Sequence, residues 1–147
     1  MLLTVSKRLE FSASRRLHVS GWREAKNLAV FGTETNARYG TGRNYVAYFV
    51  FTGPVDQSNG MLINISEIKA RAGRIVRERF DHKFLNQDNP SFHRVPPTAV
   101  NVARQLYLDV APLFQDALKF EDESAHLEIG FTTPRLGVGR FGVRSAQ

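Results

Sequence analysis

The stretch RNYVAYFVFT, residues 43–52, decides the fold, because it has the strongest strand character in the chain. Aromatic and β-branched residues fill most of its positions, a composition typical of β-strands. Apolar residues fall on both faces of this strand, which predicts that both faces are buried, one of them by a second copy of the chain. A turn-rich connection, GPVDQSNG, follows at 53–60.

The segments before this strand are less regular. Residues 2–17 alternate in part between apolar and polar side chains, which predicts a long strand with a register slip near Lys7. Residues 18–42 have weak periodicity and contain four glycines, so we expect a long loop. A loop of that length in a small domain is usually functional or mobile.

Two helices and two strands are expected after residue 60. Apolar residues at 65–80 recur every three or four positions, which predicts a helix with Ser66 as its N-cap. The stretch PPTAVNVARQLY (96–107) predicts a second helix that is capped by Thr98 and ended by Pro112. Alternation at 125–132 and at 138–143 predicts two closing strands.

The expected order is therefore β-β-α-α-β-β, an α+β fold. A four-stranded antiparallel sheet with both helices on one face is the simplest arrangement of these elements. The chain has 147 residues, so residues 1–147 are expected to form a single domain. The exposed edges of such a sheet would need covering, and assembly into a barrel would cover them.

Composition limits the classes of function. No apolar run approaches the roughly 20 residues of a membrane span, and the chain has no cysteine. A cytoplasmic location is the default expectation. The net charge is +6, with arginine in excess of lysine, which favours an anionic partner. The basic residues are spread along the chain, and this argues against a nucleic-acid partner.

Six stretches together resemble the 6-pyruvoyl-tetrahydropterin synthase and 6-carboxytetrahydropterin synthase family. They occur in the family's order and on the expected elements. They are FSASRRL (11–17), TNARYGTGRNY (35–45), GMLINISEIK (60–69), DHKFLN (81–86), PTAVNVA (97–103) and TTPRLGV (132–138). The resemblance implies the tunnelling fold, whose chains assemble into barrels, so we expect a homo-oligomer, a trimer or a hexamer.

The resemblance also indicates a changed site. The family's three zinc-binding histidines fall on Arg15, Thr41 and Arg43 here. Its catalytic cysteine falls on Thr35, and the glutamate that holds the pterin edge falls on Thr132. The part of the catalytic relay that this chain retains is Asp81-His82, expected to act as a general base or proton relay.

Arginine stays protonated and cannot bind zinc. We therefore expect no metal and no other cofactor at this site. If both Arg15 and Arg43 point inward, they would form a fork-shaped site for a small anionic, pterin-like or other ring-bearing ligand, close to His82. Glu24, Glu34 and Asp81 are the candidate internal counter-charges.

Three readings of function stay open at the level of sequence. The first is a zinc-free ligand-binding protein, with or without metal-independent lyase-like chemistry through Asp81-His82. The second is an inactive homologue that serves as a binding or scaffold subunit, its arginines a product of drift. The third is an active pterin synthase-type lyase despite the altered residues. Sequence alone does not decide whether the protein is an enzyme.

Overall fold

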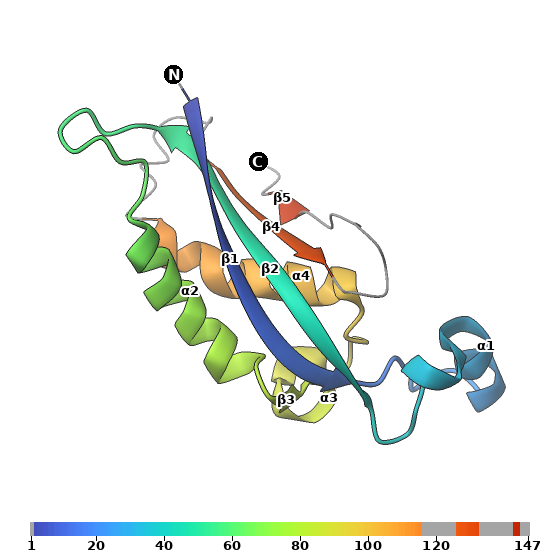
Figure 1. Cartoon of the computed structure of the whole chain (residues 1–147). Helices are drawn as coiled ribbons and strands as arrows, with labels where there is room; N and C mark the ends of the chain where they lie inside the picture. Colours follow the sequence, from blue (N-terminus) through green and yellow to red (C-terminus); the bar gives the residue numbers. More distant parts are fainter. Residues whose placement is uncertain (1, 116–125, 133–142, 145–147) are drawn as a thin grey trace.

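The structure is a computed structural model that describes residues 2–115, 126–132 and 143–144, the last two segments by their backbone. In chain order the elements are β1 (Leu2–Arg15), α1 (Glu24–Thr35), β2 (Thr41–Pro54), α2 (Ile65–Arg79), β3 (Lys83–Phe84), α3 (Leu85–Asp88), the 3-10 turn η1 (Pro90–Phe92), α4 (Ala99–Val110), the 3-10 turn η2 (Ala111–Phe114), β4 (His126–Thr132) and β5 (Val143–Arg144). Figure 1 shows a long, twisted β1–β2 pair with α2 and α4 packed on one side of it.

The described strands form one sheet in the order β3-β1-β2-β4-β5. The α+β class and the placement of two helices on one face are confirmed. The expected four-stranded, wholly antiparallel sheet is wrong in two respects, because the described residues form five strands and the two-residue strand β3 runs parallel to β1. The expected strand at 125–132 is confirmed as β4, whereas most of the one expected at 138–143 lies outside the described residues.

The β1–β2 pairing is unbroken from Leu2 opposite Pro54 to Arg15 opposite Thr41. The predicted register slip near Lys7 is therefore wrong. The irregular apolar pattern there has another cause: the first half of β1 is more exposed than the second, so few apolar residues are needed. Burial on β1 begins at Phe11 and continues at every second residue.

The core lies between the sheet and helices α2 and α4. Odd-numbered residues of β2 point into it, and Phe49 and Phe51 are completely buried. From α2 and α4 the facing residues include Ile68 and Leu106, also completely buried. The predicted helical spacing is thus confirmed as the core face of both helices.

The helix ends are only partly as expected. Thr98 caps α4, its hydroxyl accepting a hydrogen bond from the Asn101 backbone N–H at 3.2 Å. Helix α4 ends at Val110, and Pro112 lies in the turn that follows, as predicted. For α2 the cap is Asn64 instead of Ser66, because the Asn64 side chain accepts from the Ser66 N–H at 2.9 Å.

The predicted loop at 18–42 is wrong, because it contains helix α1. This helix has little apolar periodicity, and a kink at Gly32 (φ 78°) interrupts it. Local contacts hold it instead: the buried Asn27 side chain accepts from the Val19 N–H and donates to the Val19 carbonyl, at 2.8 and 3.0 Å. Trp22 stacks on Phe31 at 6.0 Å between ring centroids. Such contacts leave no periodic signal in the sequence.

Candidate functional site

The ends of β1 and β2 bring Arg15, Thr41 and Arg43 to one face of the sheet. Arg15 pairs with Thr41, and Arg43 pairs with Ala13, two residues before Arg15. Side chains two apart on a strand share a face. Tyr45 is the next residue on this face, so the buried core side of β2 leads directly into the site. We call Arg15, Thr41, Arg43 and Tyr45 the arginine cluster.

Arg15 is the most unusual member of the cluster. Only 6% of the residue is exposed, and its Nε and Nη1 atoms are buried without a hydrogen-bond partner among the described residues. Burying an unpaired donor of a charged group is costly, so native proteins rarely do it without a function. Burial raises the pKa of the Tyr45 hydroxyl, while the charge and hydrogen bonding of Arg15 and the charge of Arg43 act to lower it. The two guanidinium groups therefore act on the same phenol.

Helix α1 supplies the counter-charge nearest to Arg43. The Arg43 Nη2 atom lies 3.9 Å from the Glu34 carboxylate, and the Glu34 side chain is 64% exposed. The Thr41 hydroxyl donates a hydrogen bond to the Glu34 backbone carbonyl. The Arg43–Glu34 ion pair is long and open to solvent, so Glu34 offsets the charge of Arg43 only weakly. Glu34 was one of the three carboxylates expected from the sequence, and it reaches the cluster because α1 ends beside β2.

The glycine before β2 has a geometric reason. Gly40 adopts φ +87°, a conformation that side chains disfavour. A Cβ atom there would lie 2.8 Å from the Phe84 ring and 3.6 Å from the Arg15 carbonyl. Gly40 therefore lets the chain turn sharply into β2 while Phe84 packs against it.

Asp81 and His82 join the end of α2 to β1. The Asp81 Oδ1 atom accepts a hydrogen bond from the Ser12 backbone N–H at 3.0 Å. The backbone N–H of His82 donates to the Ser12 carbonyl at 2.6 Å. The Asp81 Oδ2 atom lies 3.5 Å from His82 Nε2. His82 has a positive φ of 56°, and its side chain is 85% exposed. Asp81 therefore has a structural contact as well as the contact to the imidazole.

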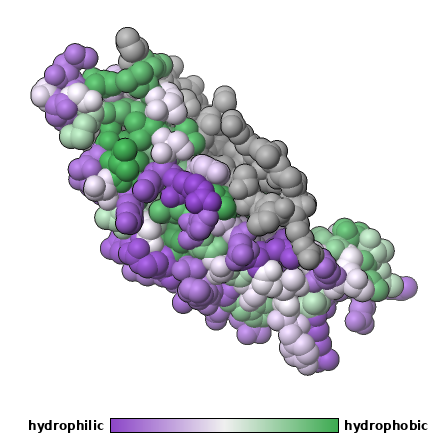
Figure 2. All heavy atoms as spheres, in the orientation of Figure 1, coloured by the Kyte–Doolittle hydropathy of each residue, from purple (hydrophilic) through white to green (hydrophobic). Residues whose placement is uncertain are grey.

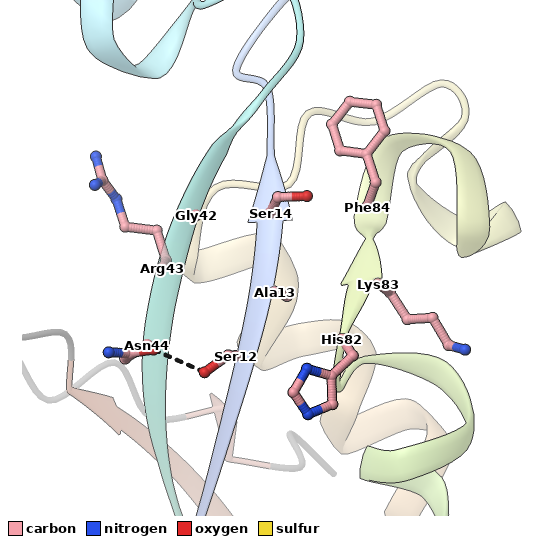
Figure 3. Close-up of a pocket in the computed structure, with 9 residues that line it drawn as sticks. All are labelled: Ser12, Ala13, Ser14, Gly42, Arg43, Asn44, His82, Lys83 and Phe84. Atoms are coloured by element: carbon pink, nitrogen blue, oxygen red, sulfur yellow. Dashed lines mark hydrogen bonds between the residues drawn. The ribbon is translucent and has the colours of Figure 1, made fainter.

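His82 and Arg43 both line an open groove of about 380 Å³ over the ends of β1, β2 and β3. Figure 3 shows that Arg43 extends from β2 away from His82, whereas the imidazole lies on the β1 side near Ser12. Ser12 donates a hydrogen bond to Asn44 Oδ1 across the groove at 2.7 Å. His82 and Arg43 thus line one groove with their side chains directed apart, whereas Arg15, Thr41 and Tyr45 are not among its lining residues.

The two remaining predicted residues lie apart from these groups. The Thr35 hydroxyl donates to the Phe31 carbonyl one turn earlier in α1, so it is engaged in its own helix. Thr132 is the last residue of β4 and pairs with Val46, and only its backbone belongs to the described part.

Tyr45 is the residue of this face that the sequence analysis did not select. Its place on this face could be predicted from the sequence, because it follows Thr41 and Arg43 at the two-residue spacing of a strand.

Among the residues described, no three histidine, aspartate or glutamate side chains come together in a way that could hold a metal ion. In the same part of the chain, no helix is long and apolar enough to cross a membrane.

The fold and the cluster together define a class: an α+β domain with a polar, arginine-bearing site where β1 ends and β2 begins. Comparisons with known proteins give the family. The family model for 6-pyruvoyl tetrahydropterin synthase matches residues 4–127, and the chain belongs to this family.

Individual relatives agree with this assignment. The chain is 38% identical over 99 residues to 6-pyruvoyl tetrahydrobiopterin synthase of Drosophila melanogaster, covering 67% of this chain and 58% of that protein. It is 36% identical over 99 residues to the human protein of the same name, covering 67% and 68%.

Solved structures support the fold. The Caenorhabditis elegans 6-pyruvoyl tetrahydropterin synthase superposes with a TM-score of 0.82 at 22% identity, covering 99% of this chain and 97% of that one. The Plasmodium falciparum 6-pyruvoyl tetrahydropterin synthase gives 0.63 at 14% identity, covering 99% of both chains. The match to tunnelling-fold structures that the six motifs predicted is thereby confirmed.

Proposed function

We propose that this 6-pyruvoyl tetrahydropterin synthase-like protein binds a small anionic, pterin-like or other ring-bearing ligand at the arginine cluster, without zinc. The observation that carries the proposal is the burial of Arg15 with two guanidinium nitrogens, Nε and Nη1, that have no hydrogen-bond partner in the part of the chain that the structure describes. A bound carboxylate, phosphate or enolate-like oxygen would accept those hydrogen bonds and offset the desolvation of the charge.

The neighbouring residues support an anionic ligand. Arg43 is mostly buried, with 17% of its side chain exposed, and its one carboxylate within 4 Å in the described part of the chain is the solvent-exposed Glu34. Tyr45 adds a hydroxyl at the buried end of the cluster, and an aromatic face that could lie against a ring. Two guanidinium groups and a phenol thus provide donors for an anion. The exposed Glu34 carboxylate is the group that such an anion would displace from Arg43.

The donor chemistry of the cluster does not fit zinc. Guanidinium groups are protonated and a threonine hydroxyl is a poor ligand, so Arg15, Thr41 and Arg43 offer none of the imidazole, thiolate or carboxylate donors that zinc takes. No step of the proposed function passes through a metal. Elemental analysis that gave one zinc per chain, lost on Thr41→Ala, would contradict this part of the proposal.

Acid–base chemistry at Asp81-His82 is the second candidate function. The 3.5 Å approach of the Asp81 carboxylate to His82 Nε2 supports a pair in which the carboxylate orients the imidazole. In a metal-independent lyase-like reaction, His82 would take a proton from a bound substrate. If the protein is an enzyme, His82→Gln should lower its turnover of the bound substrate. If it is an inactive homologue, it should bind the ligand without turnover, so this change would have no turnover to lower.

The binding proposal is tested by Arg43→Ala against Arg77→Ala. Both changes remove one positive charge, but Arg77 is exposed on α2, away from the cluster. A thermal-shift screen of pterins, purines and small carboxylates would identify a ligand, and calorimetry would measure its affinity for each variant. We expect Arg43→Ala to weaken binding by about tenfold or more, since a hydrogen bond to a charged group contributes about 1.5–3 kcal/mol. Equal effects of the two changes would leave drift as the explanation of the arginines.

We also propose that the chain forms a homo-oligomer, a trimer or a hexamer. Apolar side chains on the solvent side support this: in α1, Leu28 is 44% and Val30 is 57% exposed, and Figure 2 shows this helix as a hydrophobic region that projects from the body. Sedimentation at micromolar concentration should give a mass of three or six chains. A monomer under those conditions would be the contrary result.

A further inference from the structure

Arg79 ties the C-terminal end of helix α2 to two segments that follow it in the chain. Its Nη1 atom donates a hydrogen bond to Asp109 Oδ1 on α4 at 3.1 Å. Its Nη2 atom donates to Asn89 Oδ1 at 3.2 Å and to Ser91 Oγ at 3.0 Å, at the start of η1. One guanidinium group therefore connects α2 with both α4 and η1, and Figure 1 shows β3 and α3 directly beyond this end of α2.

Asn89 completes the connection in the opposite direction. Only 1% of Asn89 is exposed, and its Nδ2 atom donates a hydrogen bond to the Arg79 carbonyl at 3.1 Å. That carbonyl is one of the last four of α2, which have no partner inside the helix. The Asn89 Oδ1 atom also accepts from the backbone N–H of Ser91 at 3.1 Å. Asn89 thus holds both the side chain and the backbone of Arg79.

The contacts around Arg79 are shielded from water on the α4 side. The Asp109 side chain is 9% exposed, and its Oδ1 atom also accepts a hydrogen bond from Gln105 at 2.9 Å. Next in the chain, Phe80 packs edge to face on Phe92 of η1, with 6.4 Å between the ring centroids. An ion pair is stronger where water is excluded, and removing one partner leaves the other charge buried. The Arg79 contacts therefore fix this end of α2 more firmly than an exposed ion pair would.

The chain continues from Arg79 to Asp81 and His82, the proposed acid–base pair. His82 has a positive φ, which is unfavourable for a residue with a side chain and persists only where the surrounding structure holds it. Its backbone N–H bonds to Ser12, and the Asp81 backbone N–H donates to the Val76 carbonyl at 2.7 Å. The imidazole is 85% exposed, and among the described residues its polar contact is the Asp81 carboxylate. The backbone at the end of α2 therefore decides where this imidazole lies.

We propose that Arg79 is a positioning residue for the Asp81-His82 pair. Held by Asp109 and Asn89, it fixes the end of α2 so that the Asp81 carboxylate stays beside the imidazole. Arg79 is not among the residues that line the groove, so it acts through the backbone and not by contact with a ligand. This proposal rests on the acid–base function proposed above for the pair, and it names the residue that holds the pair in place.

Arg71, on the same helix, offers a matched control. Its Nη1 atom donates to the Leu113 carbonyl at 2.7 Å, and its Nη2 atom lies 2.8 Å from the Glu67 carboxylate. The side chains of Arg71 and Arg79 are 33% and 36% exposed, so the two arginines are alike in burial and in the kinds of contact they make. Arg71 lies about two helical turns before Arg79. Removing either arginine should lower stability, whereas a change at His82 should follow only from removing Arg79.

The test compares Arg79→Met with Arg71→Met by NMR of the full chain. The imidazole signals of His82 are those that His82→Gln removes. We expect Arg79→Met to shift these signals and to speed amide hydrogen exchange at His82 about tenfold or more, because the bond to Ser12 opens more often when the end of α2 is released. Arg71→Met should leave the signals in place and change this exchange less than about twofold.

A second comparison separates positioning from a general loss of stability. Asp81→Asn should shift the His82 imidazole signals in the parent chain and in Arg71→Met, because it changes the group beside the ring. In Arg79→Met the same change should have little effect, since the carboxylate is then no longer held there. Asp109→Asn keeps the size of the side chain and removes its charge, so it should reproduce the Arg79→Met result even if that variant folds poorly.

Two outcomes would overturn the proposal: equal changes at His82 in the two arginine variants, and an effect of Asp81→Asn that is undiminished in Arg79→Met. Neither measurement depends on turnover. Failure of the acid–base function gives a different result, in which His82→Gln leaves turnover unchanged while the His82 signals still respond to Arg79→Met. Where turnover is measurable, Arg79→Met should lower kcat and leave KM nearly unchanged, because Arg79 does not line the groove. A rise in KM at unchanged kcat would count against positioning.

Discussion

Replacing Arg15 with Met should raise the free energy of unfolding of the ligand-free protein by about 1–3 kcal/mol, because it removes a buried charged group whose Nε and Nη1 donors have no partner among the described residues. Most substitutions of a residue that is 6% exposed would be destabilising. Methionine keeps much of the length of arginine, is flexible, and can fill the same space. The same variant should lose anion binding at the cluster, since the inner guanidinium group is gone.

Chemical denaturation at neutral pH measures the first effect, and the ligand identified by the screen measures the second. Arg77→Met is the matched control: this arginine is exposed on α2, so its replacement should leave both quantities nearly unchanged. If Arg15→Met destabilised the protein by as much as a core substitution, the guanidinium group would already be satisfied inside the folded chain. The site would then need no ligand.

A gain in stability on removing Arg15 would also explain why such a residue is kept. Natural proteins rarely sit at their stability optimum, and residues that hold ligands are often unfavourable in the empty protein. Under the proposed function, the free energy lost by burying Arg15 would be recovered when an anion binds. The stability of the protein should therefore depend on ligand concentration more strongly in the parent chain than in Arg15→Met.

Phe49→Ala should lower the free energy of unfolding by about 3–5 kcal/mol, the range for removing a large aromatic side chain from a core. Phe49 is completely buried on β2, which pairs with β1 on one side and with β4 on the other. The facing helices α2 and α4 cannot readily collapse into the space, because they are packed against each other as well as against the sheet.

Leu108→Ala is the control for this change. Leu108 is 50% exposed on α4, and alanine favours helix, so we expect almost no loss of stability. Urea denaturation followed by circular dichroism measures both variants. A loss below about 1 kcal/mol for Phe49→Ala would mean that the sheet–helix interface is loosely packed and that β2 does not hold the site through its buried half.

The sequence by itself determined the elements whose signal is local. The strand at 43–52, the helical faces of α2 and α4, and the Thr98 cap follow from side chains a few positions apart, as does the common face of Thr41 and Arg43. A strand has a period of two and a helix a period of 3.6, so such relations can be read without knowing any distant neighbour.

Only the tertiary structure decided what each of those faces meets. It buried Arg15 beside Tyr45, brought Glu34 of α1 to Arg43, and directed His82 away from the cluster. It also placed β3 parallel to β1 and folded α1 around Asn27 and Trp22. These results depend on contacts between segments far apart in the chain. The burial of a side chain and its electrostatic environment are set by that tertiary packing, and the spacing of residues along the sequence does not determine them.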